Sequence, residues 1–135
     1  MREIKYRGRG INGEWHYGLL TELKRNYMRI EKGHYISNSS GLPFAYHVRP
    51  ETVGQYTGLK DKNRKEAYHK DIVEFEGFLY SIEWDEKRTG FYLADLVYLD
   101  DPDSEEHKIG SCISESLIRG NPFEHPHLLE GRDET

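Results

Sequence analysis

The chain has 135 residues, a net charge of −5 and a mean hydropathy of −0.87, which fit one compact domain, or two small lobes, with a modest core. Aromatic residues make up 13% of the sequence, which favours a folded over a disordered protein. No apolar run approaches the roughly 20 residues that span a bilayer, the N-terminal segment lacks the apolar stretch of a signal peptide, and a single cysteine excludes intrachain disulfides. These features predict a cytoplasmic protein.

Charge is distributed unevenly along the chain. Residues 1–32 hold eight basic and four acidic residues, whereas residues 99–135 hold three basic and ten acidic residues. Opposite charges at the two ends attract each other, within one chain or between neighbouring chains. The sequence therefore suggests a head-to-tail homo-oligomer. The alternative is a solvated surface in which the asymmetry has no role.

Alternation of apolar and polar residues predicts short strands in the first fifty residues. One begins at 4–6 and another at 15–19, after a turn at 11–13 that contains the hairpin dipeptide Asn-Gly. Residues 27–30 are a further strand candidate. The segment 34–48 suggests strand, loop and strand, because its centre, SNSSG, is rich in turn-forming residues.

The middle of the chain is dense in turn chemistry and charge. Pro50 is expected to begin a single helical turn, since proline is favoured at the first helical position. Residues 60–65 are expected to form a charged loop in water, and residues 65–70 to coil briefly. Asp71 then begins a strand and is expected to accept hydrogen bonds from backbone amides there.

The second half predicts a hairpin, DIVEF and FLYSIEW, around a tight turn at Glu76-Gly77. A loop at 85–90, a strand at 91–99, an acidic loop and a strand or short helix at 107–118 follow. The hairpin residues expected to point inward are Ile72, Phe75, Leu79, Ile82 and Trp84.

Together these elements predict a mainly β fold of antiparallel hairpins, closed into a small barrel-like or sandwich domain, with one or two short helical turns. The hairpin at 71–84 gives the second half an SH3-like character. We expect a single domain over residues 1–135, with lobes at 1–50 and 51–120 and an exposed tail at 121–135.

The segments PETVGQYTGLKDKN at 50–63 and KEAYHKDIVEF at 65–75 resemble the signature of the YopX family, small proteins of bacteriophages and prophages. The start of the chain, REIKYR at 2–7 followed by Trp15 and Tyr17-Gly18, is also similar to the family, as is its end, LIRGNPFEHPHLL. The resemblance implies a β-rich fold, no established activity, and a place in the cytoplasm of a bacterial host.

Two departures from the family pattern remove glycines. Asn63-Arg64 stands where members usually read Asn-Gly, and His69-Lys70-Asp71 stands where they read Glu-Gly-Asp. At Asn63-Arg64, a turn that needs positive φ must therefore re-form or carry strain.

This central motif is interpreted as a structural elbow, because Gly54 and Gly58 allow close backbone approach and polar side chains can bond irregular backbone. The alternative is a binding loop on a rigid scaffold. The motif residues are Pro50, Glu51, Thr52, Val53, Gly54, Gln55, Tyr56, Thr57, Gly58, Leu59, Asp61, Asn63 and Asp71.

Signals for catalysis or metal binding are weak. The proline between His125 and His127 imposes an extended backbone that suits bidentate metal capture poorly. The acidic loop 100–106 lacks the ligand order of a calcium site. Cys112 lies between isoleucines in a pattern typical of a small buried residue. We therefore predict no metal, no cofactor and no catalytic residue, although an enzyme with an unrecognised site remains an alternative.

Basic and aromatic residues alternate near the N-terminus, which favours nucleic-acid binding, because Lys and Arg meet phosphates while Tyr stacks on bases. The net charge of −5 opposes non-specific phosphate binding, and Lys and Arg stems can simply cover tyrosine faces. The candidate binding residues are Arg2, Lys5, Tyr6, Arg7, Arg9, Lys24, Arg25 and Arg29.

The sequence thus predicts a non-enzymatic phage or prophage accessory protein that binds a macromolecule and also itself. A host or phage protein is the favoured partner, nucleic acid is the alternative, and no membrane partner is expected.

Overall fold

The computed structural model describes residues 4–37 and 45–130. The chain divides into two compact units, Met1–Tyr56 and Thr57–Thr135, which we call the N-terminal and C-terminal units. The predicted single domain, with lobes at 1–50 and 51–120, stays a prediction. The mainly β antiparallel fold is confirmed. Of the two expected forms, barrel-like or sandwich, a closed barrel is wrong, because neither sheet closes on itself within the described part of the chain. The SH3-like character stays a prediction.

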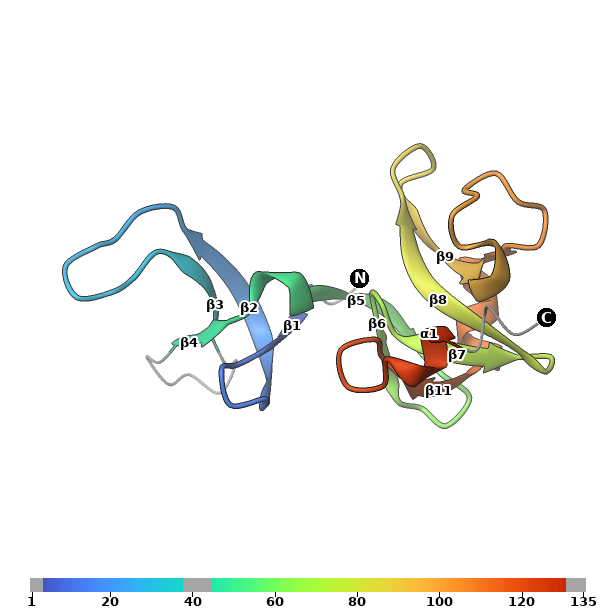
Figure 1. The fold of residues 1–135 in the computed structure, drawn as a ribbon, viewed down its shortest axis with the longest axis horizontal. Helices are drawn as coiled ribbons and strands as arrows, with labels where there is room; N and C mark the ends of the chain where they lie inside the picture. The colour runs from blue at the N-terminus through green and yellow to red at the C-terminus, as the bar shows by residue number, and fades with distance from the viewer. Residues whose placement is uncertain (1–3, 38–44, 131–135) are drawn as a thin grey trace. The chain divides into compact units, whose positions relative to one another are not determined.

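In the N-terminal unit, hydrogen-bonded strands lie in the order β4-β3-β2-β1-β5 (Figure 1). Gly13, with a φ of 86°, donates its amide to the Gly10 carbonyl and closes the predicted turn between β1 and β2. Strand β5 continues past Tyr56 into the C-terminal unit. The elements are β1 (Tyr6–Arg9), β2 (Trp15–Leu23), β3 (Gly33–Ser37), β4 (Ala45–Val48), the 3-10 turn η1 (Pro50–Thr52) with Pro50 first as predicted, and β5 (Gly54–Lys60).

Strand register sets which side chains share a face of this sheet. Arg7 pairs with Tyr17 and Arg9 with Trp15, so these four side chains lie on one face. Gly8 lies on the opposite face, where a Cβ would come within 2.9 Å of Val48 Cβ. Glycine at this position therefore lets β1 approach the buried side chains beneath it.

The predicted strand at 27–30 is wrong. Tyr27 and Ile30 form an isolated bridge in which each amide donates to the other carbonyl at 2.9 Å, around a two-residue turn at Met28-Arg29. The Asn26 side chain accepts a hydrogen bond from the Lys32 amide at 2.8 Å and braces the turn. Local hydrogen bonding thus overrides the apolar alternation. Most of the predicted SNSSG turn lies outside the described residues.

In the C-terminal unit, strands lie in the order β10-β9-β8-β7-β11, and β6 lies beside β5. Glu76 and Gly77 both have positive φ, which is the two-residue hairpin turn predicted between β7 and β8. The elements are β6 (Glu66–Tyr68), β7 (Ile72–Phe75), β8 (Phe78–Asp85), β9 (Gly90–Asp95), η2 (Leu96–Tyr98), β10 (Lys108–Ile109), η3 (Gly110–Glu115), β11 (Leu117–Gly120) and the helix α1 (His127–Glu130).

Three expectations for this unit need correction. Residues 66–68 form a strand, not a coil. The strand predicted at 91–99 ends at Asp95, because its carboxylate accepts the Val97 amide at 2.9 Å and begins a 3-10 turn. The segment expected as an exposed tail begins at a buried residue, Asn121, whose side-chain oxygen accepts the Phe123 and Glu124 amides.

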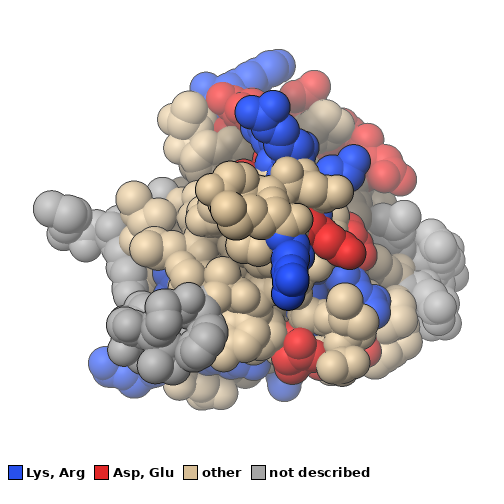
Figure 2. All heavy atoms as spheres, turned by 90° about the vertical axis from the view of Figure 1, so that its left-hand side faces the viewer, with Lys and Arg blue, Asp and Glu red and all other residues tan. Residues whose placement is uncertain are grey.

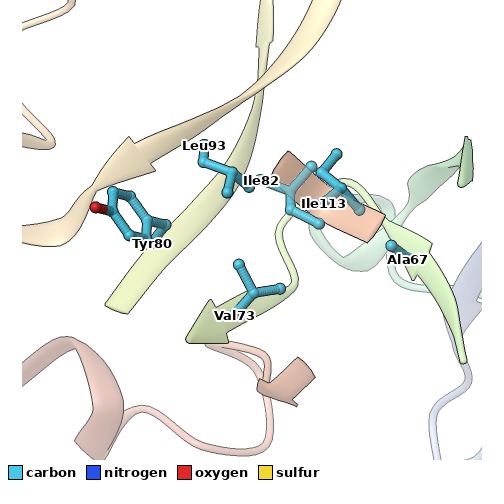
Figure 3. Packing of buried hydrophobic residues seen from close by; sticks show 6 residues of the cluster. All are labelled: Ala67, Val73, Tyr80, Ile82, Leu93 and Ile113. Atoms are coloured by element: carbon cyan, nitrogen blue, oxygen red, sulfur yellow. The ribbon is translucent and has the colours of Figure 1, made fainter. Parts of the chain in front are cut away.

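Six buried side chains form the hydrophobic core of the C-terminal unit, with η3 packed against β7 and β9 (Figure 3). Of the residues predicted to point inward, Ile82 belongs to this cluster, while Ile72 is buried on the opposite face of the hairpin. Val73 and Tyr80 were missed. The cluster consists of Ala67, Val73, Tyr80, Ile82, Leu93 and Ile113. No helix within the described residues is long and apolar enough to cross a membrane.

Candidate functional site

The basic residues of β1, and Lys5 just before it, pack on aromatic rings of their own unit. The Arg7 guanidinium carbon lies 4.7 Å from the centre of the Trp15 ring, and that of Arg9 lies 6.0 Å from it. The Lys5 ammonium lies 5.3 Å from the Tyr56 ring centre. Arg7 is buried, and Arg9 Nε donates to the Gly13 carbonyl at 3.0 Å. These cation–π contacts stabilise the sheet, so these residues have a structural role.

The other predicted binding residues lie elsewhere. Tyr6 is on the opposite face of β1 from Arg7, because side chains alternate along a strand. Lys24, Arg25 and Arg29 are exposed in the connection between β2 and β3. Arg2 lies outside the described residues. The seven described candidates are therefore spread over both faces of the first strand, its N-terminal flank and the connection between β2 and β3.

The β2–β3 connection, residues 24–32, combines exposed cations with exposed apolar side chains; we call it the β2–β3 arm. Tyr27, Met28 and Ile30 are 60%, 88% and 51% exposed. In Figure 2, where the left-hand side of Figure 1 faces the viewer, Lys and Arg side chains lie among uncharged atoms with Asp and Glu side chains beside them. Sequence reasoning missed the apolar part of this site, because 27–30 was interpreted as a strand. The positive φ at Met28 is not visible in the sequence.

Aromatic rings also line the sheet of the N-terminal unit. Tyr35 and His47 stack at 4.8 Å between ring centres, and His16 stacks on Tyr46 at 4.1 Å. The pKa of Glu14 is lowered, first by a hydrogen bond from its own backbone amide and then by one from His16. These stacked pairs contribute to the packing of side chains on the sheet.

The residues of the central motif mostly contact backbone atoms. Thr52 Oγ1 accepts the Arg9 amide at 2.8 Å, and Thr57 Oγ1 donates to the Ala67 carbonyl at 2.9 Å. The Asp71 carboxylate accepts the Tyr68 amide at 2.8 Å. All three side chains are buried. These contacts favour the structural elbow over the binding loop.

Asp61 corrects the expectation that loop 60–65 lies wholly in water. It is buried, and its carboxylate accepts the amides of Asn63, Lys65 and Ile118. The other part of the loop, residues 62–65, is exposed.

The positions where the family glycines are replaced keep the glycine conformation. Arg64 has a φ of 67° and Lys70 a φ of 79°. The turns have therefore not re-formed, and the backbone carries the strain of a side chain in the left-handed region.

An open cavity of about 460 Å³ lies in the C-terminal unit, between the β8–β9 turn and the acidic loop. Trp84 and Tyr92 line it, and the pKa of Tyr92 is raised by burial and then by Glu83 and Asp85. Acidic and basic residues are equally frequent among its charged lining residues, so the charge of the cavity favours neither an anionic nor a cationic ligand. They are Asp85, Glu86, Lys87, Arg88, Asp103 and Lys108.

His107 lines the same cavity but is held by backbone groups. Its Nδ1 accepts a hydrogen bond from the Asp95 amide at 2.9 Å, and its Nε2 donates one to the Asp101 carbonyl at 2.8 Å. Both ring nitrogens are therefore engaged, so this histidine is not poised as a general base.

Within the described residues there is no group of three His, Cys, Asp or Glu side chains that could hold a metal ion. The rings of His125 and His127 lie 6.0 Å apart at 77°. Cys112 is partly buried against the core of the C-terminal unit.

Comparison with known proteins identifies the lineage. No curated protein matches this chain. The crystal structure of protein EF1440 from Enterococcus faecalis has a similar fold, with a TM-score of 0.51 and 20% sequence identity over 96% of this chain and 99% of that one. The family model described as YopX protein matches residues 5–130, nearly the whole chain, and includes both units. The chain therefore belongs to the YopX family.

Proposed function

We propose that this protein is a non-enzymatic phage or prophage accessory protein whose N-terminal unit binds an anionic macromolecule. The observation that carries the proposal is the β2–β3 arm, where three large apolar side chains are exposed among basic ones. Exposed apolar surface beside charge is typical of a site that a partner covers.

The charge of the two units supports an anionic partner. The N-terminal unit holds nine Lys and Arg against five Asp and Glu, a balance of +4, and the C-terminal unit holds ten against nineteen, a balance of −9. The N-terminal unit thus attracts a polyanion and the C-terminal unit repels it. A polyanion is therefore expected to bind the N-terminal unit although the net charge of the chain is negative.

Retention on heparin tests this proposal with the full chain. Replacing Lys24, Arg25 and Arg29 together by glutamine is expected to lower the salt concentration at which the protein elutes. A matched variant replaces three exposed lysines of the C-terminal unit, Lys62, Lys65 and Lys87, and is expected to elute like the parent. Equal elution of the parent and the arm variant would overturn the proposal.

Self-association is a second candidate, and it is favoured by the opposite charges of the two units. The N-terminal unit of one copy would attract the C-terminal unit of another, and salt would weaken the contact. Light scattering at high protein concentration is expected to give a mass above that of one chain at low salt. A monomer under these conditions contradicts self-association.

A further inference from the structure

We infer that the β2–β3 arm enters the minor groove of double-stranded DNA and that the Met28 side chain inserts between two base pairs. The inference rests on the proposed function and names its partner.

The tip of the arm is held in one conformation. Tyr27 and Ile30 exchange two backbone hydrogen bonds at 2.9 Å, and the Asn26 side-chain oxygen accepts a hydrogen bond from the Lys32 amide at 2.8 Å. A tip fixed before binding loses little conformational entropy when it is buried in a partner.

Met28 occupies a backbone conformation that favours glycine. Its φ is 54°, at the first central position of a two-residue turn, and its side chain is 88% exposed. Because this side chain is exposed, it adds little apolar packing that could offset the strain of the backbone conformation. A strained residue held at an exposed tip suggests that the side chain itself has a use.

The chemistry of the tip distinguishes duplex from single-stranded nucleic acid. Met and Ile are among the aliphatic wedges that unstack a base step and bend a duplex. Proteins that hold single strands use flat rings instead, and at the arm only Tyr27 offers one.

The charge of the arm agrees with the minor groove of a duplex. Lys24, Arg25, Arg29 and Lys32 flank the tip, with Glu31 as the acidic residue among them. Basic side chains on both sides of the tip can reach the phosphates along the two edges of the minor groove, from which apolar wedges enter the base stack.

The test uses the full chain and a short mixed-sequence duplex labelled at its ends, so that titration gives the affinity and energy transfer gives the bend. Met28→Gly suits the positive φ and should preserve the turn. We expect it to weaken duplex binding about tenfold and to abolish the bend. Ile11→Ala removes another exposed apolar side chain of the same unit and should change neither. Unchanged affinity and bend in Met28→Gly would overturn the inference.

Two further probes separate this inference from the proposed function. The single strand of the same sequence should bind more weakly than the duplex, and vesicles of anionic lipid should not retain the protein. Tighter binding to the single strand, or binding to vesicles alone, would overturn the duplex inference while leaving an anionic partner for the arm. Absence of binding to all three probes, with heparin elution unaffected by the arm variant, would remove both.

Discussion

The Asp61 carboxylate accepts a hydrogen bond from the Ile118 amide at 3.0 Å and so joins two segments 57 residues apart in the sequence. Its other oxygen accepts the Asn63 and Lys65 amides at 2.9 Å each. One buried side chain thus satisfies three backbone donors of a loop and of β11.

Asp61→Asn should therefore destabilise the C-terminal unit. The substituted amide nitrogen cannot accept a hydrogen bond and would face one or two of these donors. We expect the free energy of unfolding to fall by about 2 kcal/mol, measured by urea denaturation. Asp103→Asn, at an exposed position of the acidic loop, should change it by less than about 0.5 kcal/mol. Equal effects of the two substitutions would contradict the role of Asp61.

Restoring glycine at position 64 should stabilise the protein. Arg64 has a φ of 67°, where a side chain costs about 1–2 kcal/mol, and part of this gain is offset by the greater freedom of glycine in the unfolded chain. Arg64→Gly should raise the free energy of unfolding by about 0.5–1 kcal/mol. Lys62→Gly in the same loop, where φ is not positive, should lower it. A loss of stability in both variants would refute the strain at Arg64.

Arg7 and Arg25 should behave differently, although both were candidates for binding. Arg7 is buried over the Trp15 ring, so Arg7→Ala should lower the free energy of unfolding by about 1–3 kcal/mol and remove the nearer of the two guanidinium groups on that ring. Arg25→Ala should leave stability within about 0.5 kcal/mol but lower the salt needed for elution from heparin. Thermal unfolding and heparin elution of both variants check this division, which fails if Arg25→Ala is the more destabilising change.

Two tyrosines should make the C-terminal unit sensitive to high pH. Burial raises the pKa of Tyr80, with Asp95 and Glu76 adding to it, and burial also raises the pKa of Tyr92. An unfolded tyrosine ionises near pH about 10, so the folded state holds its proton more tightly and stability falls as pH rises above this value. Their contribution is fully present below it.

Urea denaturation at several pH values between about 8 and 11 checks this sign. The Tyr80→Phe, Tyr92→Phe double variant should lose less stability with rising pH than the parent. Tyr98→Phe, which alters an exposed ring of the same unit, should follow the parent. The prediction is wrong if the free energy of unfolding falls equally steeply with pH in all three proteins.

Much of the fold was predictable from local signals. Residues that favour a turn by their own backbone preferences can be recognised in the sequence. The turns at Asn12-Gly13 and Glu76-Gly77 and the start of η1 at Pro50 were therefore predicted correctly. The spacing of apolar residues predicted where the strands lie, but it did not predict which face of each strand is buried in the main core. Val73 and Ile72 are adjacent apolar residues, and only the pairing with β8 decides which of them joins the main core.

The candidate site was less predictable because its features depend on conformation. The cation-rich start of the chain suggested a binding surface, yet Arg7 and Arg9 pack on Trp15, a contact set by the β1–β2 register. The arm was mistaken for a strand because the alternation at 27–30 resembles one. Composition could not reveal that Met28 takes a positive φ and points to solvent.

Strand β5 has a consequence for how relatives of this protein can vary in length. Its first residues pair with β1 in the N-terminal unit, and the Thr57 hydroxyl donates a hydrogen bond to the Ala67 carbonyl in the C-terminal unit. One residue inserted between Tyr56 and Thr57 would leave the first pairing intact but turn every later side chain of the strand to the other side. Natural insertions and deletions should therefore collect in the β2–β3 arm and the acidic loop, while the spacing between Gly54 and Asp61 stays constant.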